Sequence, residues 1–261
     1  MKTNRIYGIT LRHLYNLRHS LDRMSDVFYW PTVDLILWGL TGKYFLTISP
    51  HNEQVLVAII GGILFWILPW RSQNEITLNV CVEIWDRNLV NLFIAPLKFT
   101  EWIFSLLMLG FIKAMISLCF ASFVAFLLYK INIFTYGFYL IPFLFLLLMS
   151  GWWIGFIVAA IILRYGSRIQ TLTWTVPWIV APFSAIYFPV SVLPNWAQVI
   201  SRALPSSYVF EGARQVILQH TLNWNYLTIS LVLNIVYLIL SILFFRSSFK
   251  NAFDRGLQGI S

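Results

Sequence analysis

The sequence contains few charged residues and very little cysteine. Asp, Glu, Lys and Arg make up 11% of its 261 residues, whereas a typical soluble domain has about 25%. So few polar residues cannot cover the surface of a soluble domain of this length, which excludes a soluble enzyme. Cys81 and Cys119 are far apart in apolar segments, and we interpret them as ordinary buried thiols rather than a disulfide or a metal pair.

Sequence signatures of catalysis are also missing. The sequence has no G-x-x-x-x-G-K-[ST] phosphate loop and no G-x-S-x-G, H-E-x-x-H or paired-cysteine motif. Its four histidines show no spacing that is typical of metal ligands. We therefore expect the chain to have no catalytic site and to hold no cofactor or metal of its own.

Apolar and aromatic residues dominate instead. Hydrophobic residues make up 59% of the chain, which includes 12 Trp, 12 Tyr and 22 Phe, and the mean hydropathy is +0.75. Such a composition suits a chain whose solvent is partly lipid and partly the membrane interface. The sequence therefore predicts an all-α integral membrane protein and excludes a disordered chain.

Six stretches are long and apolar enough to cross a hydrocarbon core of about 30 Å. They lie at about Val27–Ile48, Val55–Val80, Trp102–Leu128, Tyr136–Leu163, Leu172–Val190 and Tyr226–Phe245. The second is apolar only as far as Trp70, and from Arg71 it becomes a polar helical stretch. That stretch must be shielded by protein or lie near water.

The basic residues predict the orientation of these spans. The formal net charge is +8, and most Lys and Arg residues flank apolar runs. With both termini in the cytoplasm, thirteen of them lie in cytoplasmic segments and three outside. This asymmetry predicts a multi-pass protein of the cytoplasmic (inner) membrane. It favours anionic membrane lipids, and not nucleic acid, as the partner of the basic residues.

Residues 1–26 precede the first span and do not read as a signal peptide, because the polar stretch is long and no A-x-A site follows the span. As a helix, this segment has one broad apolar face, formed by Tyr7, Leu11, Leu14, Leu17, Leu21 and Met24. We expect an amphipathic helix that lies in the cytoplasmic interface. A short cytosolic helix packed on a partner is the alternative. Residues 27–261 form the six-span domain.

The segment after the second span alternates charge with an apolar stripe. It runs from Glu83 to Pro96 and carries Leu89, Leu92 and Phe93 on the stripe. An amphipathic helix at about 83–97 could lie across the membrane surface and present this face to a soluble partner. A simple loop helix remains equally compatible with the pattern.

A second non-spanning stretch, at about 191–219, precedes the last span. Pro194 can open one short helix, and Pro205 can open a second, with Ser206 or Ser207 available as a cap. Each helix is too short to span but keeps an apolar face, which is typical of helices that lie in or on a leaflet. We interpret them as an outer gate, with an ordinary outer loop as the alternative. The assigned gate residues are Pro194, Trp196, Pro205, Tyr208, Glu211 and Arg214.

The order of these segments along the chain resembles that of the type-2 ABC exporter permeases. These are the membrane subunits of transporters for drugs, lipids and cell-surface glycans. Arg87-Asn-Leu-Val-Asn-Leu-Phe-Ile-Ala-Pro96 resembles the coupling helix of that family. The motifs that resemble its region before the last span and its basic tail are Leu193-Pro-Asn-Trp196, Leu204-Pro205, Tyr208, Gly212-Ala-Arg214 and Phe253-Asp-Arg-Gly256. The resemblance covers essentially the whole chain.

The resemblance implies that two separate ATPase subunits bind ATP and Mg, and that two permease chains pair with the substrate path between them. It implies a coupling role for Glu83, Asp86, Arg87, Leu89, Leu92, Phe93 and Pro96. Family members usually carry an acidic residue just after the Arg, where this chain has Val90 and Asn91. The electrostatic part of docking is therefore weaker here, or rests on Glu83 and Asp86.

Aromatic residues of the fourth and fifth spans are candidates for the substrate path. They are Trp152, Trp153, Trp174, Trp178 and Tyr187. Such side chains can stack on sugar rings or hold drugs and lipid tails, so a lipid-linked glycan, a lipid and a hydrophobic drug all remain open. Gly151 and Gly155 form a GxxxG that allows close helix approach or occurs by chance.

Two other classes compete with the permease interpretation. An ion- or proton-coupled carrier or channel needs ionisable groups on facing helices, and Asp34, Lys43 and Lys113 are the candidates. A membrane-embedded transferase needs clustered acids or histidines, which the sequence does not show. For Lys113 we expect snorkelling or pairing across helices, which is a structural role.

Overall fold

The computed structural model describes residues 3–18, 21–48, 53–86, 88 and 97–254. Within these ranges every regular element is helical, as the composition predicts. The elements are α1 (Thr3–Arg18), α2 (Leu21–Ile48), α3 (Glu53–Trp85), α5 (Phe99–Tyr129), η1 (Ile133–Tyr139), α6 (Leu140–Tyr165), η2 (Ser167–Ile169), α7 (Leu172–Val180), η3 (Ala181–Ser184), η4 (Val190–Val192), α8 (Asn195–Ala203), α9 (Pro205–Gln219) and α10 (Trp224–Asp254).

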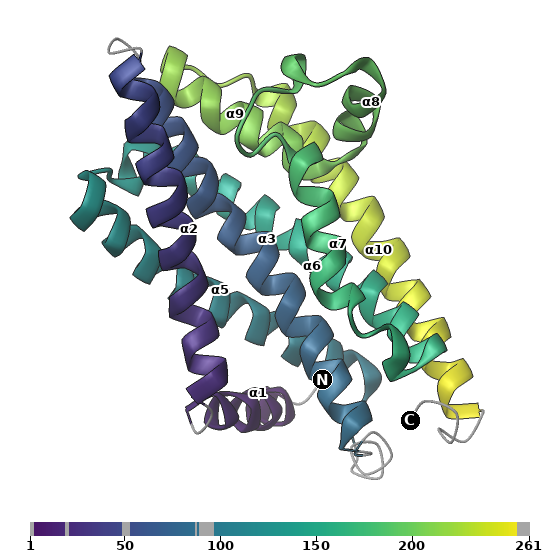
Figure 1. The fold of residues 1–261 in the computed structure, drawn as a ribbon. Helices are drawn as coiled ribbons and strands as arrows, with labels where there is room; N and C mark the ends of the chain where they lie inside the picture. The colour runs from purple at the N-terminus through teal and green to yellow at the C-terminus, as the bar shows by residue number, and fades with distance from the viewer. Residues whose placement is uncertain (1–2, 19–20, 49–52, 87, 89–96, 255–261) are drawn as a thin grey trace.

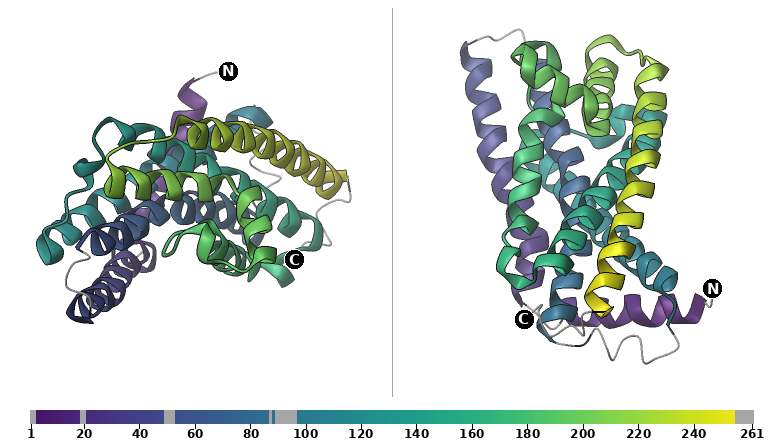
Figure 2. Two further views of the ribbon diagram at one scale, coloured as in Figure 1. Left: turned by 90° about the horizontal axis from the view of Figure 1, so that it is seen from above. Right: turned by 90° about the vertical axis from the view of Figure 1, so that its right-hand side faces the viewer.

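The long helices run side by side along the length of the molecule (Figure 1). Helix α1 lies across one end of the molecule, beside the start of α2, and α10 finishes at the same end (Figure 2). Helices α8 and α9 lie at the opposite end. These two ends are called the α1 end and the α8–α9 end below.

Four helical segments are long and apolar enough to cross a membrane. They are Gln54–Trp85, Phe99–Tyr129, Ile133–Tyr165 and Trp224–Ala252, and they confirm the second, third, fourth and sixth predicted spans. Helix α2 has 28 residues, enough to cross about 30 Å at about 1.5 Å per residue, but it carries Asp34 and Lys43 and is not among the four. The count of six spans therefore stays a prediction.

The fifth predicted span, Leu172–Val190, is not one continuous helix. Helix α7 ends at Val180, a 3₁₀ turn follows, and Ala185 has a φ of 58° in the left-handed region. Pro182 lies in this turn, and because proline has no backbone N–H, it cannot continue the hydrogen bonding of the helix. The chain then turns back over α3, where a Cβ at Gly62 would lie 2.5 Å from the carbonyl oxygen of Ile186.

The N-terminal part is two helices rather than one. Helix α1 ends at Arg18 and α2 begins at Leu21, so the domain boundary that we expected after residue 26 falls inside α2. The start of α2 packs on the protein and does not extend along the membrane interface, because Asp26 pairs with Arg71 of α3.

The close contact between α3 and α6 forms the centre of the fold. A Cβ at Gly151 would lie 2.6 Å from the carbonyl oxygen of Pro69, and one at Gly155 would lie 3.0 Å from that of Gln73. The GxxxG therefore marks a true close approach of two helices. Helix α6 also packs along α10, so α3, α6 and α10 form one layer of tightly packed helices.

The polar stretch of α3 is shielded by protein, as its position beside a membrane span requires. Arg71, Ser72, Gln73, Asn74, Glu75 and Thr77 are each at most 5% exposed. The outer faces of α5 and α10 are apolar instead, with Phe123 on α5 64% exposed. Cys119 is exposed on α5, so the prediction of a buried thiol is wrong there and right for Cys81.

Candidate functional site

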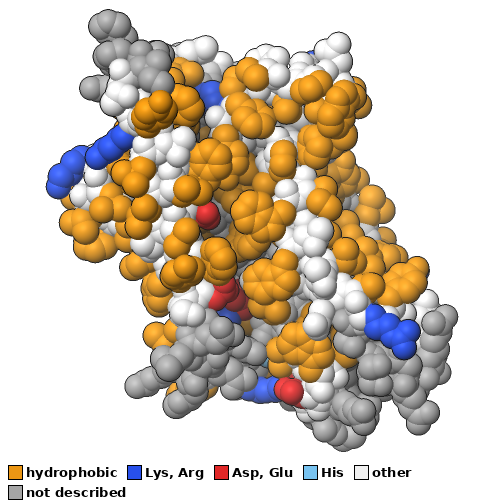
Figure 3. Space-filling model, in the orientation of Figure 1, with side chains coloured by type: hydrophobic (Ala, Val, Ile, Leu, Met, Phe, Trp, Pro, Cys, Tyr) orange, Lys and Arg blue, Asp and Glu red, His pale blue; other side chains and the backbone are white. Residues whose placement is uncertain are grey.

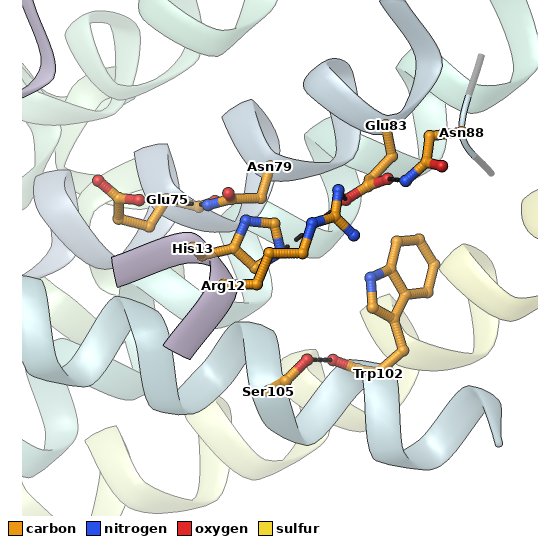
Figure 4. A network of polar contacts seen from close by, with 8 residues as sticks. All are labelled: Arg12, His13, Glu75, Asn79, Glu83, Asn88, Trp102 and Ser105. Carbon is orange, nitrogen blue, oxygen red and sulfur yellow. Dashed lines mark hydrogen bonds and ion pairs between the residues drawn. The ribbon is translucent and has the colours of Figure 1, made fainter. Parts of the chain in front are cut away.

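The carboxylate of Glu83 joins α1 to the last turn of α3 (Figure 4). It accepts a hydrogen bond from Nη2 of Arg12 at 2.9 Å and another from the side-chain amide of Asn88 at 2.6 Å. Nε2 of His13 lies 3.9 Å from the same carboxylate. With a side chain only 1% exposed, Glu83 is a buried link between α1 and the chain that follows α3.

A second ion pair fixes α1 to α5. Nη1 of Arg5 lies 3.6 Å from Glu101, whose carboxylate also accepts the backbone N–H of Lys98 at 3.1 Å. The face of α1 that docks on the protein is thus the polar one. Tyr7, on the apolar face, is 61% exposed, which suits an apolar face that is turned towards lipid.

The residues assigned to ATPase coupling divide into three groups. Glu83 lies in α3 and is committed to contacts within the chain. Asp86 is exposed just after α3. The remaining residues, Arg87, Leu89, Leu92, Phe93 and Pro96, lie outside the described residues. Of the two acids expected to aid docking, only Asp86 is exposed.

Arg71 and Asp26 form an ion pair between α3 and α2. Nη1 of Arg71 lies 2.5 Å from Oδ2 of Asp26, and Nη2 donates to the backbone carbonyl of Asp26. The side chain of Arg71 is 1% exposed and that of Asp26 is 22% exposed. A buried guanidinium without a partner is strongly destabilising, so this pair fixes the start of α2 on α3.

Glu75 and Lys113 form a second buried pair, between α3 and α5. Nζ of Lys113 donates to Oε2 of Glu75 at 2.5 Å, and the side-chain amide of Asn79 donates to the same oxygen at 3.2 Å. Both charged side chains are at most 6% exposed. Pairing of Lys113 across helices is confirmed, and Glu75 is its partner.

A cavity of about 520 Å³ opens between α2, α3 and the start of α7, near the α1 end. Side chains that line it include Asp26, Tyr29 and Trp30 of α2, Trp85 of α3, and Gln170 and Trp174 beside or on α7. This face of the molecule is hollowed between α2 and α7, with hydrophobic side chains along the walls and acidic ones inside (Figure 3). The size is that of a typical small-molecule site.

Three of the five substrate-path aromatics lie along this hollow face. The rings of Trp174 and Trp178 on α7 are 6.4 and 5.6 Å from that of Trp70. Tyr187 stacks on Trp38 of α2 at 4.3 Å. Aromatic rings from α2, α3 and α7 therefore follow one another from the cavity towards the α8–α9 end.

The other two aromatics lie elsewhere. Trp153 is 9% exposed between α6 and α10, where its Nε1 donates to Asn234 at 3.2 Å. Trp152 lines a separate apolar cavity of about 600 Å³ between α1 and α5. Neither side chain lines the cavity at α7, because both lie on α6, which contributes no residue to its lining.

The three ionisable residues considered for a carrier are not joined by any contact of the described residues. Lys113 is paired with Glu75. Lys43 is exposed, with its Nζ 5.1 Å from the ring centre of Tyr129. Asp34 is half-buried on α2. No row of ionisable groups on facing helices is therefore formed by these three.

At the α8–α9 end, Glu211 and Arg214 of α9 hold the turn that follows η3. Oε1 of Glu211 accepts the backbone N–H of Val190 at 2.5 Å, and Nη2 of Arg214 donates to the carbonyl of Ala185 at 2.8 Å. The two side chains also pair with each other at 3.3 Å. The broken end of the fifth predicted span is thus fixed to α9.

Helices α8 and α9 begin directly after Pro194 and at Pro205. The predicted serine cap is wrong, because the Oγ of Ser207 donates to the carbonyls of Ser201 and Leu204 and Ser206 is hydrogen-bonded to Ser184. Both hydroxyls tie neighbouring segments to α9. The hydroxyl of Tyr208 donates to the carbonyl of Arg202 at 2.8 Å and so joins α9 back to α8.

Helix α8 turns its apolar face outward. Trp196, Val199 and Ile200 are 65%, 69% and 42% exposed, whereas Ala197 and Ser201 are buried against the protein. The small side chains of α8 pack against the protein, and its large apolar side chains point away from it. This arrangement suits a helix that lies in the outer part of a leaflet.

Sequence reasoning missed the partners of the buried charges. No sequence motif marks Arg12 as a partner of Glu83, and Asp26 fell at an expected domain boundary. The separation of Arg12 from Glu83 by 71 residues left no local signal. The available hint was the unusual run of polar residues after Trp70, since buried charges require partners from other helices.

These features define a multi-pass membrane protein with an all-helical core, buried ion pairs and a helix, α1, that lies across one end. The sequence model of the ABC-2 type transporter family matches residues 18–218. This match spans most of the chain, and the chain belongs to the ABC-2 type transporter family, whose membrane permeases associate with an ABC ATPase. No curated protein gives a significant match.

Proposed function

We propose that the chain is the permease subunit of an ATP-driven exporter, in which two copies pair and two ATPase subunits bind ATP and Mg. Membership of the ABC-2 type transporter family supports this proposal. One structural observation carries it furthest: α3 is a single helix from Glu53 to Trp85. It connects the α8–α9 end directly to the segment that resembles a coupling helix.

The coupling step follows from this continuity. Closure of the ATPases would displace the segment after α3, and Glu83 would carry part of that displacement to α1 through Arg12. The α1 end then faces the cytoplasm of the inner membrane, and the α8–α9 end faces outward. The excess of Lys and Arg in the segments at the α1 end supports this orientation.

The substrate would enter at the cavity between α2, α3 and α7 and move along the aromatic rings towards the α8–α9 end. Trp174 lines the cavity and Trp178 lies beside Trp70 farther along the same face. Glu211 and Arg214 would keep the outer gate closed by holding the turn at 185–190. A lipid-linked glycan, a lipid or a hydrophobic drug fits such a path.

Purification of the tagged full-length chain from its native membrane in mild detergent tests the proposal. We expect a P-loop ATPase to co-purify in near-equal amount and to be lost with Leu92→Asp. The same substitution at Leu257, outside the coupling segment, is the control. Arg87→Ala is expected to uncouple ATP hydrolysis from transport while the complex still assembles.

A chain that purifies alone would contradict the proposal, above all if reconstituted vesicles conduct ions without ATP. That outcome would favour a carrier or channel and direct attention to Asp34 and Lys43. Unchanged transport in both Arg87→Ala and Leu92→Asp would contradict the coupling assignment alone.

A further inference from the structure

The net charge inside the cavity near the α1 end restricts what it can bind. Asp26 is an acidic side chain of its lining, and the described lining contains no Lys, Arg or His. Arg71 lies behind Asp26, 1% exposed, and neutralises it through the ion pair at 2.5 Å. Among the described lining residues, an anionic phosphate would therefore meet no accessible cation, and an organic cation would meet no uncompensated anion.

The other polar groups of the cavity are neutral. Gln170, Thr171 and Thr173 at the start of α7 bring amide and hydroxyl groups to its wall. Such groups both donate and accept hydrogen bonds. They match a ligand that carries several hydroxyls, each of which also donates and accepts.

Aromatic faces complete the lining. Tyr29, Trp30, Trp85 and Trp174 come from three different helices and are 58%, 50%, 49% and 41% exposed. A large ring that is half-exposed beside neutral hydrogen-bonding groups can cover the apolar face of a ligand while its polar end meets water or protein. A sugar ring has such a face, with hydroxyls around its edge.

We propose that this cavity binds an uncharged sugar, which refines the proposed function by naming the substrate class at its entry site. The recognition combines stacking on Trp174 and Trp30 with hydrogen bonds to Gln170 and to the neutralised carboxylate of Asp26. The inference rests on the proposed function only in treating the bound sugar as a transport substrate. Sugar binding itself is a property of the cavity and can be measured without transport.

Photolabelling of the full-length chain in lipid nanodiscs tests the proposal. The probe is octyl β-glucoside with a diazirine in its alkyl chain, and two matched probes carry a trimethylammonium or a phosphate in place of the glucose. We expect the glucoside to label the peptides around Trp30 and Trp174 about fivefold more than either charged probe. Equal labelling by all three probes would overturn the proposal.

Substitutions connect the labelling to the cavity. Trp174→Ala is expected to lower glucoside labelling about fivefold, because it removes one stacking face. Trp224→Ala, which removes an exposed tryptophan on α10, is expected to leave it unchanged. Asp26→Asn uncovers the charge of Arg71 and is expected to shift labelling towards the phosphate probe. If neither Trp174→Ala nor Asp26→Asn changes the labelling, the proposal is overturned.

Competition identifies the source of the sugar. If methyl β-glucoside and octyl β-glucoside both block labelling, the ligand is a free sugar. If only octyl β-glucoside blocks labelling, the ligand is the headgroup of a glycolipid. Blocking by neither would overturn the proposal. The ATPase content of the same preparation is measured in parallel, so a failure of sugar binding with the ATPase still bound contradicts this inference and leaves the exporter proposal intact.

Discussion

Lys113 on α5 and Glu75 on α3 form an ion pair with an Nζ–Oε2 distance of 2.5 Å in the interior of the protein. Two charges removed from water cost free energy that only their mutual attraction and added hydrogen bonds can offset. Asn79 supplies one such hydrogen bond to Glu75. The pair therefore fixes α3 against α5 and makes each partner depend on the other.

Removing one partner of this pair should be worse than removing both. Lys113→Met leaves Glu75 buried and uncompensated, and we expect it to lower the free energy of unfolding by about 3–5 kcal/mol. The double variant with Glu75→Met should regain most of this loss, because two apolar side chains of similar volume replace the charges. Thermal unfolding in nanodiscs measures the difference, and losses that simply add would contradict the coupling.

The link through Glu83 predicts a change in the dynamics of α1. Glu83→Ala removes the acceptor of the Arg12 and Asn88 hydrogen bonds. Because Arg12 is 40% exposed, the loss is partly screened by water, and amide hydrogen exchange in α1 should rise roughly fivefold. Asp86→Ala, at an exposed acid three residues on, should leave the exchange of α1 as it is. Equal effects of the two variants would show that Glu83 does not hold α1.

The α3–α6 contact predicts opposite effects for two glycine substitutions. Gly151→Ala places a Cβ 2.6 Å from the Pro69 carbonyl oxygen and should destabilise the protein by about 1–3 kcal/mol. Gly8→Ala on α1, where nothing lies within 4 Å, should be neutral or stabilising by about 0.4–1 kcal/mol. Unfolding midpoints of the two variants report the sign, and a stable Gly151→Ala would exclude close packing at this point.

The outward apolar face of α8 predicts contact with lipid. In a variant with Cys81 and Cys119 replaced by Ala, a cysteine at Val199 should react with a lipid-soluble maleimide and resist a charged one, because this position is 69% exposed on the apolar face. A cysteine at Arg202, on the polar side of α8, should react with both. Reaction of Val199→Cys with the charged reagent would place this face in water.

Much of the fold could be predicted from hydropathy alone, because helices that cross a membrane need about 20 apolar residues and satisfy their own backbone hydrogen bonds. The stretch after Trp70 was expected to be shielded by protein or to lie near water, and the structure shows the first of these. The break of the fifth predicted span was missed, although Pro182 lies at it. Apolar composition extends beyond Val180, and a hydropathy pattern does not distinguish a helix from an apolar turn packed on protein.

The candidate site was less accessible to sequence reasoning. Trp174, Trp178 and Tyr187 were chosen for their chemistry and lie along one hollow face. Trp153 was chosen for the same reason and packs against α10 instead. Which way a side chain points depends on helix rotation, and a helix that is apolar all round carries no signal for that rotation. The Arg71–Asp26 pair required a contact between two helices, which a single sequence does not reveal.

The glycine contact between α3 and α6 leaves no slack between these helices, and α10 packs on the far side of α6. The three helices therefore form one tightly packed layer. Helix α7 is joined to its neighbours through Gly166 and Ala185, both with positive φ, and α2 is attached near its start by the Arg71–Asp26 pair. The hollow face therefore lies between this tightly packed layer and two helices, α2 and α7, of which α2 is attached to α3 by an ion pair and α7 is bounded by two turns with positive φ.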